Sequence, residues 1–364
     1  MKNPFKFGSI VDEPFFTNRH AEIQNLKMML NSENHIILIS PRRYGKTSLV
    51  SKVIKETKRS CVSLDLQLIT GVEDFASQLL KRVFKAYPFE KLKLMVRQFR
   101  IIPTISLNPV NNEIDIAFQP HNASFPILED VLNLIESLGS KTEKPIVIFD
   151  EFQEVHRIGQ GLDRQLRAIM QQHQCINYIL LGSIESMMQA IFEKKKSSFY
   201  HFGMLLPLGK IPYDDFKAYL KQGFNGLNIE EDLLSDEILK FTDCHPYYTQ
   251  QLAYKVWEIA VSEKDSPSII LQAINQLVEI HDMDYERLWQ TIKQTDKKIM
   301  IGLSTDDRSL LSDVFSRKYA ITATSTTFSS IKRLQEIGYI LKNGKTYEID
   351  DPFFKQWIKQ RRDR

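Results

Sequence analysis

The sequence predicts an α/β protein: a parallel sheet wrapped by helices, followed by a small all-helical domain and a C-terminal winged helix. Four short apolar runs are separated by amphipathic segments of helix length, which is typical of strands alternating with crossover helices; they lie at 36–39, 61–66, 146–149 and 176–181. From Tyr213 to about Tyr285 the apolar spacing is purely helical. Near the C-terminus, Asn343-Gly344 follows helical segments and stands between two short β-prone runs, and this dipeptide strongly favours a hairpin.

The bulk properties suit a soluble, folded protein of two or three domains. The chain has 364 residues, of which 43% are hydrophobic and 26% charged, close to the average for globular proteins. No apolar run approaches the roughly 20 residues that a membrane-spanning helix needs. The N-terminus lacks the apolar centre of a signal peptide, so we expect a cytoplasmic protein. The expected domains are an α/β domain at 1–212, a helical lid at 213–285 and a winged helix at 286–364.

Within the α/β domain, amphipathic patterns predict helices between the apolar runs, at about 46–56, 72–87, 163–173 and 184–193. The helix at 72–87 places its apolar side chains on one face, namely Phe75, Leu79, Leu80 and Val83. Residues 101–118 alternate apolar and polar side chains around the turn-rich segment 108–112. This alternation indicates an inserted β-hairpin, to which we assign no chemistry.

The C-terminal domain contains three expected helices, at about 296–303, 308–315 and 326–337. Gly338 is placed to end the last of them, whose apolar stripe consists of Phe328, Ile331, Leu334 and Ile337. The hairpin strands are then 339–342 and 345–349. From Glu286 onward, 16 basic residues stand against 10 acidic ones, whereas the preceding residues carry 32 against 35. The winged helix is therefore the basic end of the chain.

The segment Ser40–Thr47 has the context of a phosphate-binding loop, because it follows an apolar strand and opens a helix. Backbone N–H groups and the positive helix end would hold phosphates, Lys46 would neutralise the β- and γ-phosphates, and the Thr47 hydroxyl would ligate Mg²⁺. A serine stands where the motif usually begins with glycine. The predicted nucleotide-binding residues are Ser40, Pro41, Arg42, Arg43, Tyr44, Gly45, Lys46, Thr47 and Ser48.

A second apolar strand, 146–149, runs directly into the carboxylates Asp150 and Glu151. This is the Walker B arrangement: Asp150 can hold the Mg²⁺ shell, while Glu151 can orient and polarise the attacking water. Either signal alone is weak. Together, in this order, they predict a catalytic ATP site with Lys46 and Glu151 as participants and with Thr47 and Asp150 as metal ligands.

Further motifs point to one family. They are the box from Phe15 to Ile23 (Phe-Phe-Thr-Asn-Arg-His-Ala-Glu-Ile), Asp150-Glu151-Phe152-Gln153, Leu181-Gly182-Ser183, His245-Pro246-Tyr247-Tyr248, and the terminal Asp351-Pro352-Phe353-Phe354-Lys355-Gln356-Trp357. With the loop, they make the chain resemble the archaeal-type ATPases of the STAND clade within the AAA+ proteins, relatives of archaeal origin-recognition initiators. The resemblance implies an AAA+ P-loop core with a helical lid, ATP and ADP as ligands, and Mg²⁺ as the metal.

The resemblance also implies roles for single residues. Ser183 stands at the family's sensor-1 position, where it would contact the γ-phosphate or the attacking water; the alternative is a serine that caps the next helix. His245 and Pro246 open a helix at 246–262, and in similar proteins this element packs on the nucleotide; the alternative is a plain helix start with a surface histidine. Residues Pro14 to Arg19 would lie against the adenine.

One departure concerns catalysis. Relatives often read Tyr-Gly-Arg after the sensor-1 helix, whereas this chain has Tyr200-His201-Phe202. The arginine that could complete a neighbour's site is therefore missing at this position, and an arginine finger contributes several orders of magnitude in rate. Arg42 and Arg43 are candidates to replace it, or else surface charges.

Two functions remain open. In the first, ATP drives a switch that repositions the winged helix for a protein or DNA partner. In the second, the chain is a DNA-binding ATPase: the helix at 326–337 enters the major groove of double-stranded DNA and the wing touches the backbone. The groups available for DNA are Lys332, Arg333, Lys342, Lys345 and the tail Arg361-Arg362-Asp363-Arg364, with Ser329 and Ser330 either on phosphates or on the solvent face. A homo-oligomer is compatible with both functions.

Overall fold

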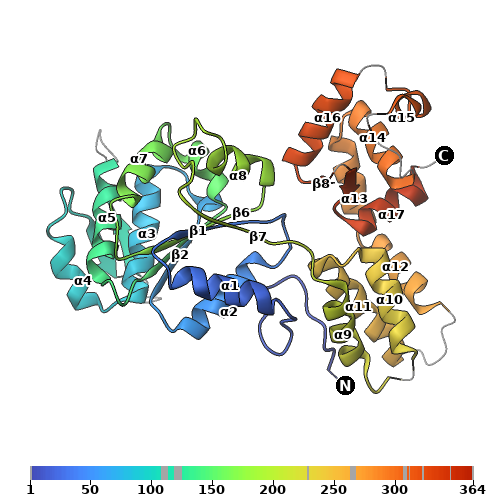
Figure 1. Cartoon of the computed structure of the whole chain (residues 1–364), viewed down its shortest axis with the longest axis horizontal. Helices are drawn as coiled ribbons and strands as arrows, with labels where there is room; N and C mark the ends of the chain where they lie inside the picture. Colours follow the sequence, from blue (N-terminus) through green and yellow to red (C-terminus); the bar gives the residue numbers. More distant parts are fainter. Residues whose placement is uncertain are drawn as a thin grey trace. The chain divides into compact units, whose positions relative to one another are not determined.

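A computed structural model describes residues 2–107, 114–118, 125–227, 229–262, 268–305, 310, 312–321, 324–344 and 346–362 (Figure 1). The chain divides into two compact units. The sheet unit holds His20–Pro41 and Leu49–Leu208, and the helical unit holds Met1–Arg19, Arg42–Ser48 and Gly209–Arg364. Within the described part of the chain, no helix combines the length and the apolar character required to cross a membrane.

The sheet unit is built on five parallel strands in the order β2-β5-β6-β1-β7. Four of them confirm the predicted runs: β1 (His35–Ile39), β2 (Cys61–Asp65), β5 (Ile146–Asp150) and β6 (Asn177–Gly182). The fifth strand, β7 (Gly203–Pro207), was not predicted. It lies at the edge beside β1, and its Met204 and Leu205 side chains are 39% and 42% exposed, so it lacks the continuous buried run of a central strand.

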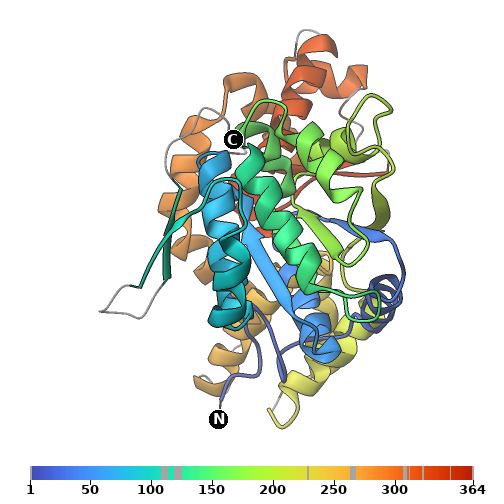
Figure 2. The same cartoon turned by 90° about the vertical axis from the view of Figure 1, so that its left-hand side faces the viewer.

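Helices cover the sheet, and Figure 2 shows α3 and α5 side by side on one face. The predicted face of α3 is fully buried. A separate antiparallel pair, β3 (Thr104–Leu107) with β4 (Ile114–Ala117), occupies the region of the expected hairpin, whose turn residues 108–112 lie outside the described residues. The helices are α1 (His20–Leu30), α2 (Lys46–Thr57), α3 (Val72–Ala86), α4 (Phe89–Val96), α5 (Phe125–Leu138), α6 (Val155–Ile158), α7 (Leu162–Met170) and α8 (Glu185–Phe192).

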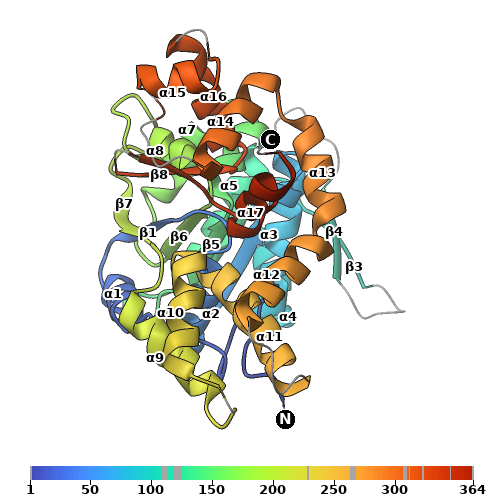
Figure 3. The ribbon, with the colours of Figure 1, turned by 90° about the vertical axis from the view of Figure 1, so that its right-hand side faces the viewer.

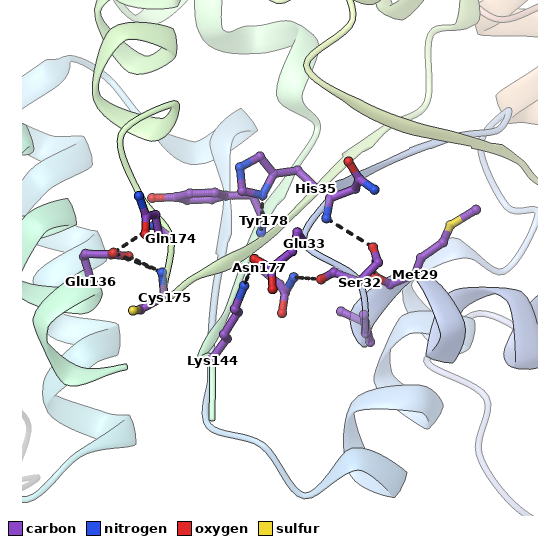
Figure 4. A network of polar contacts seen from close by, with 12 residues as sticks. Met29, Ser32, Glu33, His35, Glu136, Lys144, Gln174, Cys175, Asn177 and Tyr178 are labelled. Atoms are coloured by element: carbon purple, nitrogen blue, oxygen red, sulfur yellow. Dashed lines mark hydrogen bonds and ion pairs between the residues drawn. The ribbon is translucent and has the colours of Figure 1, made fainter. Parts of the chain in front are cut away.

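Polar contacts tie down the amino edge of the sheet, where β6 begins (Figure 4). The Asn177 amide donates to the Ser32 carbonyl at 3.4 Å, and the Glu136 carboxylate accepts the backbone N–H of Cys175 at 3.0 Å. Lys144 donates to Glu33 at 2.6 Å. The first two contacts satisfy backbone groups at this end of the sheet. In open parallel sheets ligands bind at the opposite, carboxyl edge.

His35 lies at this amino edge, stacked on Phe202 with 4.6 Å between ring centroids. Burial, reinforced by the nearby cations Arg167, His173 and Lys144, lowers the pKa of His35 to about 4. Below its ordinary pKa of 6.5 the unfolded chain takes up a proton that the folded chain refuses, so stability falls as pH falls from about 6.5 towards 4. A tenfold difference in proton affinity corresponds to about 1.4 kcal/mol. Because of His35, the free energy of unfolding should therefore fall by roughly 2 to 3 kcal/mol between pH 7 and about pH 4.5.

Urea unfolding at both pH values measures this loss. His35→Gln, which carries no charge at either pH, should lose less stability on acidification by roughly that amount. The neighbouring carboxylates titrate in both proteins and cancel in the comparison. An equal pH dependence of the two unfolding free energies would show that His35 is protonated in the folded protein.

The helical unit begins with five helices: α9 (Tyr213–Phe224), α10 (Glu231–Thr242), α11 (Pro246–Ser262), α12 (Ile269–Ile280) and α13 (Asp282–Thr291). Their buried side chains form one core with those of the C-terminal winged helix, and Figure 3 shows α17 beside α12. The N-terminal segment joins the same core, because the Phe5 ring packs on Phe224 with centroids 4.8 Å apart. An added Cβ at Gly223 would come within 2.4 Å of the Phe5 ring, so glycine makes room for it.

The winged helix comprises α14 (Gln294–Thr305), α15 (Asp313–Lys318), α16 (Thr324–Glu336), the hairpin β8 (Ile340–Asn343) with β9 (Thr346–Ile349), and α17 (Pro352–Arg361). The turn lies one residue later than predicted, because Asn343 is the last residue of β8 and pairs with Thr346. Gly344 follows it with a left-handed backbone, at φ 59°. The helix expected at 308–315 begins instead at Asp313, after positions 306–309 and 311, which lie outside the described residues.

The predicted stripe of α16 is only half right. Ile331 and Leu334 are buried, whereas Phe328 and Ile337 are 54% and 50% exposed. Thr327 and Ser330 are buried in their place, which is possible because a helical hydroxyl can find a hydrogen-bond partner within its own helix or on a neighbour. The core-facing side of α16 is therefore rotated from the predicted one.

Candidate nucleotide-binding site

The predicted phosphate loop follows β1 in the chain and leads into α2. Arg43 and Gly45 both have left-handed backbones, with φ of 64° and 86°, and glycine adopts this conformation without steric cost. Lys46 and Thr47 are the first residues of α2, where backbone N–H groups lack helical partners and favour anions. Lys46 is buried while Thr47 is exposed. The loop residues therefore fit a phosphate group.

Residues of the N-terminal segment form hydrogen bonds with the phosphate loop. The Arg19 guanidinium, itself buried, donates to the Tyr44 carbonyl at 3.3 Å and to the Gly209 carbonyl at 2.7 Å. The backbone N–H of Val11 donates to the Ser48 hydroxyl at 3.0 Å. Arg19 thus contacts the phosphate loop directly and supports its shape, a role that the sequence did not indicate.

Other predicted residues meet at the carboxyl edge of the sheet. Asp150 ends β5, Ser183 follows β6, and Ser40 follows β1. The Ser40 backbone N–H donates to the Gly182 carbonyl at 3.3 Å, and its side chain is fully buried. The serine that replaces the motif's glycine therefore fits here without exposure.

Glu151 is held in one orientation by two side chains. Its backbone is left-handed, with φ 51°, and its N–H donates to Asp150 Oδ1 at 2.9 Å. The Ser183 hydroxyl donates to Glu151 Oε2 at 2.6 Å, and the Gln153 amide donates to the same oxygen. Ser183 therefore contacts the predicted catalytic carboxylate. Gln153 was not singled out, although it is buried two residues beyond Glu151.

His245 caps the helix that Pro246 opens. Its Nδ1 accepts the backbone N–H groups of Tyr247 and Tyr248 at 3.2 and 3.4 Å. The ring is 2% exposed and packs edge-on against Tyr44 of the phosphate loop, with centroids 4.7 Å apart. The alternative of a surface histidine is therefore wrong, and a role for His245 in reading the nucleotide stays a prediction.

The residues considered for the arginine role have different surroundings. Arg42 is exposed. Arg43 is exposed as well, but its guanidinium lies over the Tyr247 ring at 4.6 Å and donates to the Tyr248 hydroxyl at 3.0 Å, so it is more than a surface charge. Phe202 is buried in the core of the sheet unit. Lys46 and Thr47 belong to the helical unit, and Asp150 and Glu151 belong to the sheet unit.

Comparisons with known proteins agree with this organisation. Residues 16–252 match a family model described as "ATPase domain predominantly from Archaea", and residues 283–360 match one described as "Probable winged helix domain". The structure resembles the Walker-type ATPase Paby2304 of Pyrococcus abyssi, with a TM-score of 0.72 and 18% identity over 98% of this chain and 99% of that one.

Two further similar structures come from Aeropyrum pernix. The ORC2 protein, in ADPNP–ADP complexes, has a TM-score of 0.54 and 14% identity, covering 98% of this chain and 96% of that one. The ORC1 protein, in complex with DNA, has a TM-score of 0.50 and 12% identity, covering 94% and 91%. At these identities the likeness shows the fold. Among curated proteins, none matches the chain.

Proposed function

Because the chain belongs to a family of ATPase domains found predominantly in Archaea, we propose that it binds Mg-ATP through Lys46, Thr47 and Asp150 and hydrolyses it with Glu151 as the base. The observation that carries this proposal is the carboxylate of Glu151, which stands at the end of β5 and is held by Ser183 and Gln153. Such positioning is what a water-orienting carboxylate requires.

The chain's own residues divide the work as follows. The loop from Ser40 to Ser48 binds phosphates through backbone N–H groups, and the Lys46 ammonium offsets their charge. Thr47 and Asp150 supply oxygen ligands of the kind that Mg²⁺ prefers. Bound Mg²⁺ supplies charge neutralisation on the phosphate oxygens. Ser183 and Gln153 keep Glu151 in place to accept a proton from water.

Calorimetric titration of ATP and ADP, with Mg²⁺ and with a chelator, tests the proposal. We expect one nucleotide for each chain and weaker ATP binding when Mg²⁺ is removed, because the β- and γ-phosphate charge is then offset by protein groups alone. Absence of nucleotide binding under both conditions would reject the assignment.

We further propose that nucleotide binding acts as a switch on the winged helix and thereby on a protein or DNA partner. In support, the phosphate loop and the winged helix belong to the same compact unit, and α17 shares a hydrophobic core with α11 and α12 of the helical region. A change at the loop therefore has packed elements through which to reach the winged helix.

A specific surface favours DNA as a second candidate. A hollow of about 340 Å³ on the winged helix is lined by Lys293, Arg333 and five serine and threonine residues of α14 and α16. Hydroxyl groups and helix N-termini are common ligands of backbone phosphates. The Ser329 hydroxyl lies on the exposed side of α16, whereas Ser330 is buried and accepts from Arg333. Lys345, Asp363 and Arg364, also considered for DNA, lie outside the described residues.

The structure shows which basic residues of the winged helix are suitable for substitution in a test of DNA binding. Arg333 donates through two nitrogens to Asp296 at 2.6 and 2.7 Å, and the Asp296 side chain is 3% exposed. Arg333 therefore forms a bidentate ion pair with Asp296. Removing Arg333 would leave the buried Asp296 carboxylate without a compensating charge, which would lower the free energy of unfolding by about 3 kcal/mol. Lys332 is 80% exposed and makes only a 3.8 Å ion pair with Glu336.

We expect Lys293→Glu with Lys332→Glu to weaken any binding of double-stranded DNA at least about tenfold and to leave ATP affinity unchanged, because each lysine lost removes a phosphate contact and each glutamate added repels phosphate. Fluorescence anisotropy across a salt series, with and without ATP, makes the measurement. Lys255→Glu with Lys240→Glu, two lysines of the helical region, is the matched control for charge. Equal DNA affinity in the parent and the winged-helix variant would remove this surface from the DNA hypothesis.

A further inference from the structure

An apolar groove lies between α10 and α12, which are neighbours in the helical unit (Figure 3). Its volume is about 520 Å³, a size typical of ligand-binding sites. The floor consists of Leu234, Ile270 and Ile274, which are buried in the core of this unit. Leu233 and Leu271 also line the groove, and the side chain of each is more than half exposed. Single exposed leucines are common on protein surfaces, but two that line one apolar groove indicate an interaction site.

The groove is negatively charged. Glu230 and Glu237 line it, and both are exposed. They stand three positions before and four positions after Leu233, so all three residues lie on one face of α10. Neither carboxylate has an ion-pair partner among the described residues. Asp232 and Asp236 of the same helix, in contrast, pair with lysines of α9.

The charge of the groove restricts what it can bind. No described residue that lines it is basic, so an occupant must supply the positive charge that pairs with Glu230 and Glu237. Nucleic acids and anionic lipid surfaces carry negative charge and are therefore repelled. The occupant that fits has an apolar surface flanked by Lys or Arg side chains.

The conformation of the occupant follows from its backbone. Both sides of the groove are helices, so it offers no strand edge to which an extended segment could add. An extended segment would place its own N–H and C=O groups against apolar side chains without partners. A helix bonds these groups internally and presents apolar side chains at i, i+3, i+4 and i+7. From Glu230 to Glu237 the groove runs about 10 Å along α10, which matches two turns of such a helix.

We propose that the groove between α10 and α12 docks a basic amphipathic helix of a partner protein. The apolar side chains of that helix cover Leu233 and Leu271, and its Lys or Arg side chains pair with Glu230 and Glu237. This surface is separate from the winged helix and from the phosphate loop. The inference therefore goes beyond the proposed function and holds whether or not ATP is bound.

Fluorescence anisotropy with the full chain and labelled peptides of about five helical turns tests this docking. In one panel of peptides, Leu, Ile, Met or Phe occupies positions i, i+3, i+7 and i+11, and lysines flank this stripe. In a second panel, glutamates replace the lysines. We expect the tightest lysine peptide to bind at least about tenfold more tightly than its glutamate counterpart, because like charges repel across an interface.

Two pairs of substitutions separate the apolar and the charged contributions. Leu233→Ser with Leu271→Ser should weaken binding of the lysine peptide at least about tenfold, because the peptide then covers less apolar area. Both leucines are already more than half exposed, so the fold should persist. Glu230→Lys with Glu237→Lys should reverse the order of the two panels, so that glutamate peptides bind more tightly than lysine peptides.

Ile280→Ser with Met283→Ser is the matched apolar control, because both side chains are exposed and neither lines the groove. Asp214→Lys with Asp215→Lys, at two exposed positions of α9, is the matched control for charge. The apolar control should bind the lysine peptide like the parent, and the charge control should keep the parent's preference for lysine peptides. Thermal unfolding shows which variants are folded.

Absence of binding by every lysine peptide, or equal binding of the two panels, overturns the inference. Undiminished binding to the folded leucine variant, or an unchanged order of the panels with the folded charge-reversal variant, overturns it as well. Should one of these variants fail to fold, the other decides. Because the assay contains no ATP, its outcome is independent of the nucleotide titration, and failure of the docking inference leaves the proposed function intact.

Discussion

Lys46→Ala is expected to lower ATP affinity by at least about 100-fold, which corresponds to roughly 3 kcal/mol. Lys46 is the first residue of α2 and is 7% exposed. Its ammonium is the group that would offset the β- and γ-phosphate charge. An alanine retains the helix start, because alanine has the highest helix propensity, so the fold should persist. Calorimetric titration with Mg-ATP measures the loss.

Lys55→Ala is the control, since it removes an exposed lysine from the last turn of the same helix. Its ATP affinity should equal that of the parent. Thermal unfolding of all three proteins separates lost binding from lost structure. An unchanged affinity in folded Lys46→Ala would end the assignment of residues 40–48 as a phosphate loop.

Glu151→Gln is expected to lower the rate of ATP hydrolysis by a factor of about 10² to 10⁴ while leaving ATP affinity close to that of the parent. The amide has the size of the carboxylate and can still accept from Ser183 and Gln153, but it cannot take a proton from water. Steady-state phosphate release beside a fluorescent-nucleotide titration separates the two effects. Asp150→Asn should instead weaken Mg²⁺-dependent binding itself.

Glu154→Gln supplies the control, because Glu154 lies three residues away and pairs with Arg157 at 2.7 Å. We expect the parent rate itself to be low in dilute solution, because the family resemblance places Phe202 at a position where relatives often carry an arginine. A rate that rises with protein concentration would point to an arginine from a second copy. Turnover of many ATP each second by a dilute monomer would contradict the missing-arginine argument, and a rate unaffected by Glu151→Gln would exclude that residue as the base.

The sequence predicts most of the sheet unit because buried parallel strands are continuous apolar runs. Strand β7 is not predicted in this way, because it is an edge strand without a continuous buried run. It begins at Gly203 and ends at Pro207, and two of its apolar side chains are exposed. Helix α5 is absent from the predicted set although its buried residues have helical spacing, namely Ile127, Leu128, Val131, Leu132 and Ile135. That signal was available from periodicity alone.

The buried face of α16 is predicted wrongly for a different reason. The prediction assigns the more hydrophobic Phe328 to the core, whereas the structure buries Thr327. The candidate site shows the same limit. Motif spacing predicts the types of residue that hold phosphate, metal and water. It cannot predict that Arg43 meets Tyr248 across 205 positions, or that Ser183 meets Glu151 across 32, since such contacts depend on tertiary packing of distant segments.

The order of the two units along the chain has a consequence for synthesis on the ribosome. The helical unit consists of residues 1–19, 42–48 and 209–364. Phe5 therefore emerges some two hundred residues before its packing partner Phe224. During that interval the two segments of the sheet unit are synthesised, while the first nineteen residues have no native core to join. Contacts of such long sequence separation form slowly, so Phe5 stays without its native packing partners until the helical unit has been synthesised.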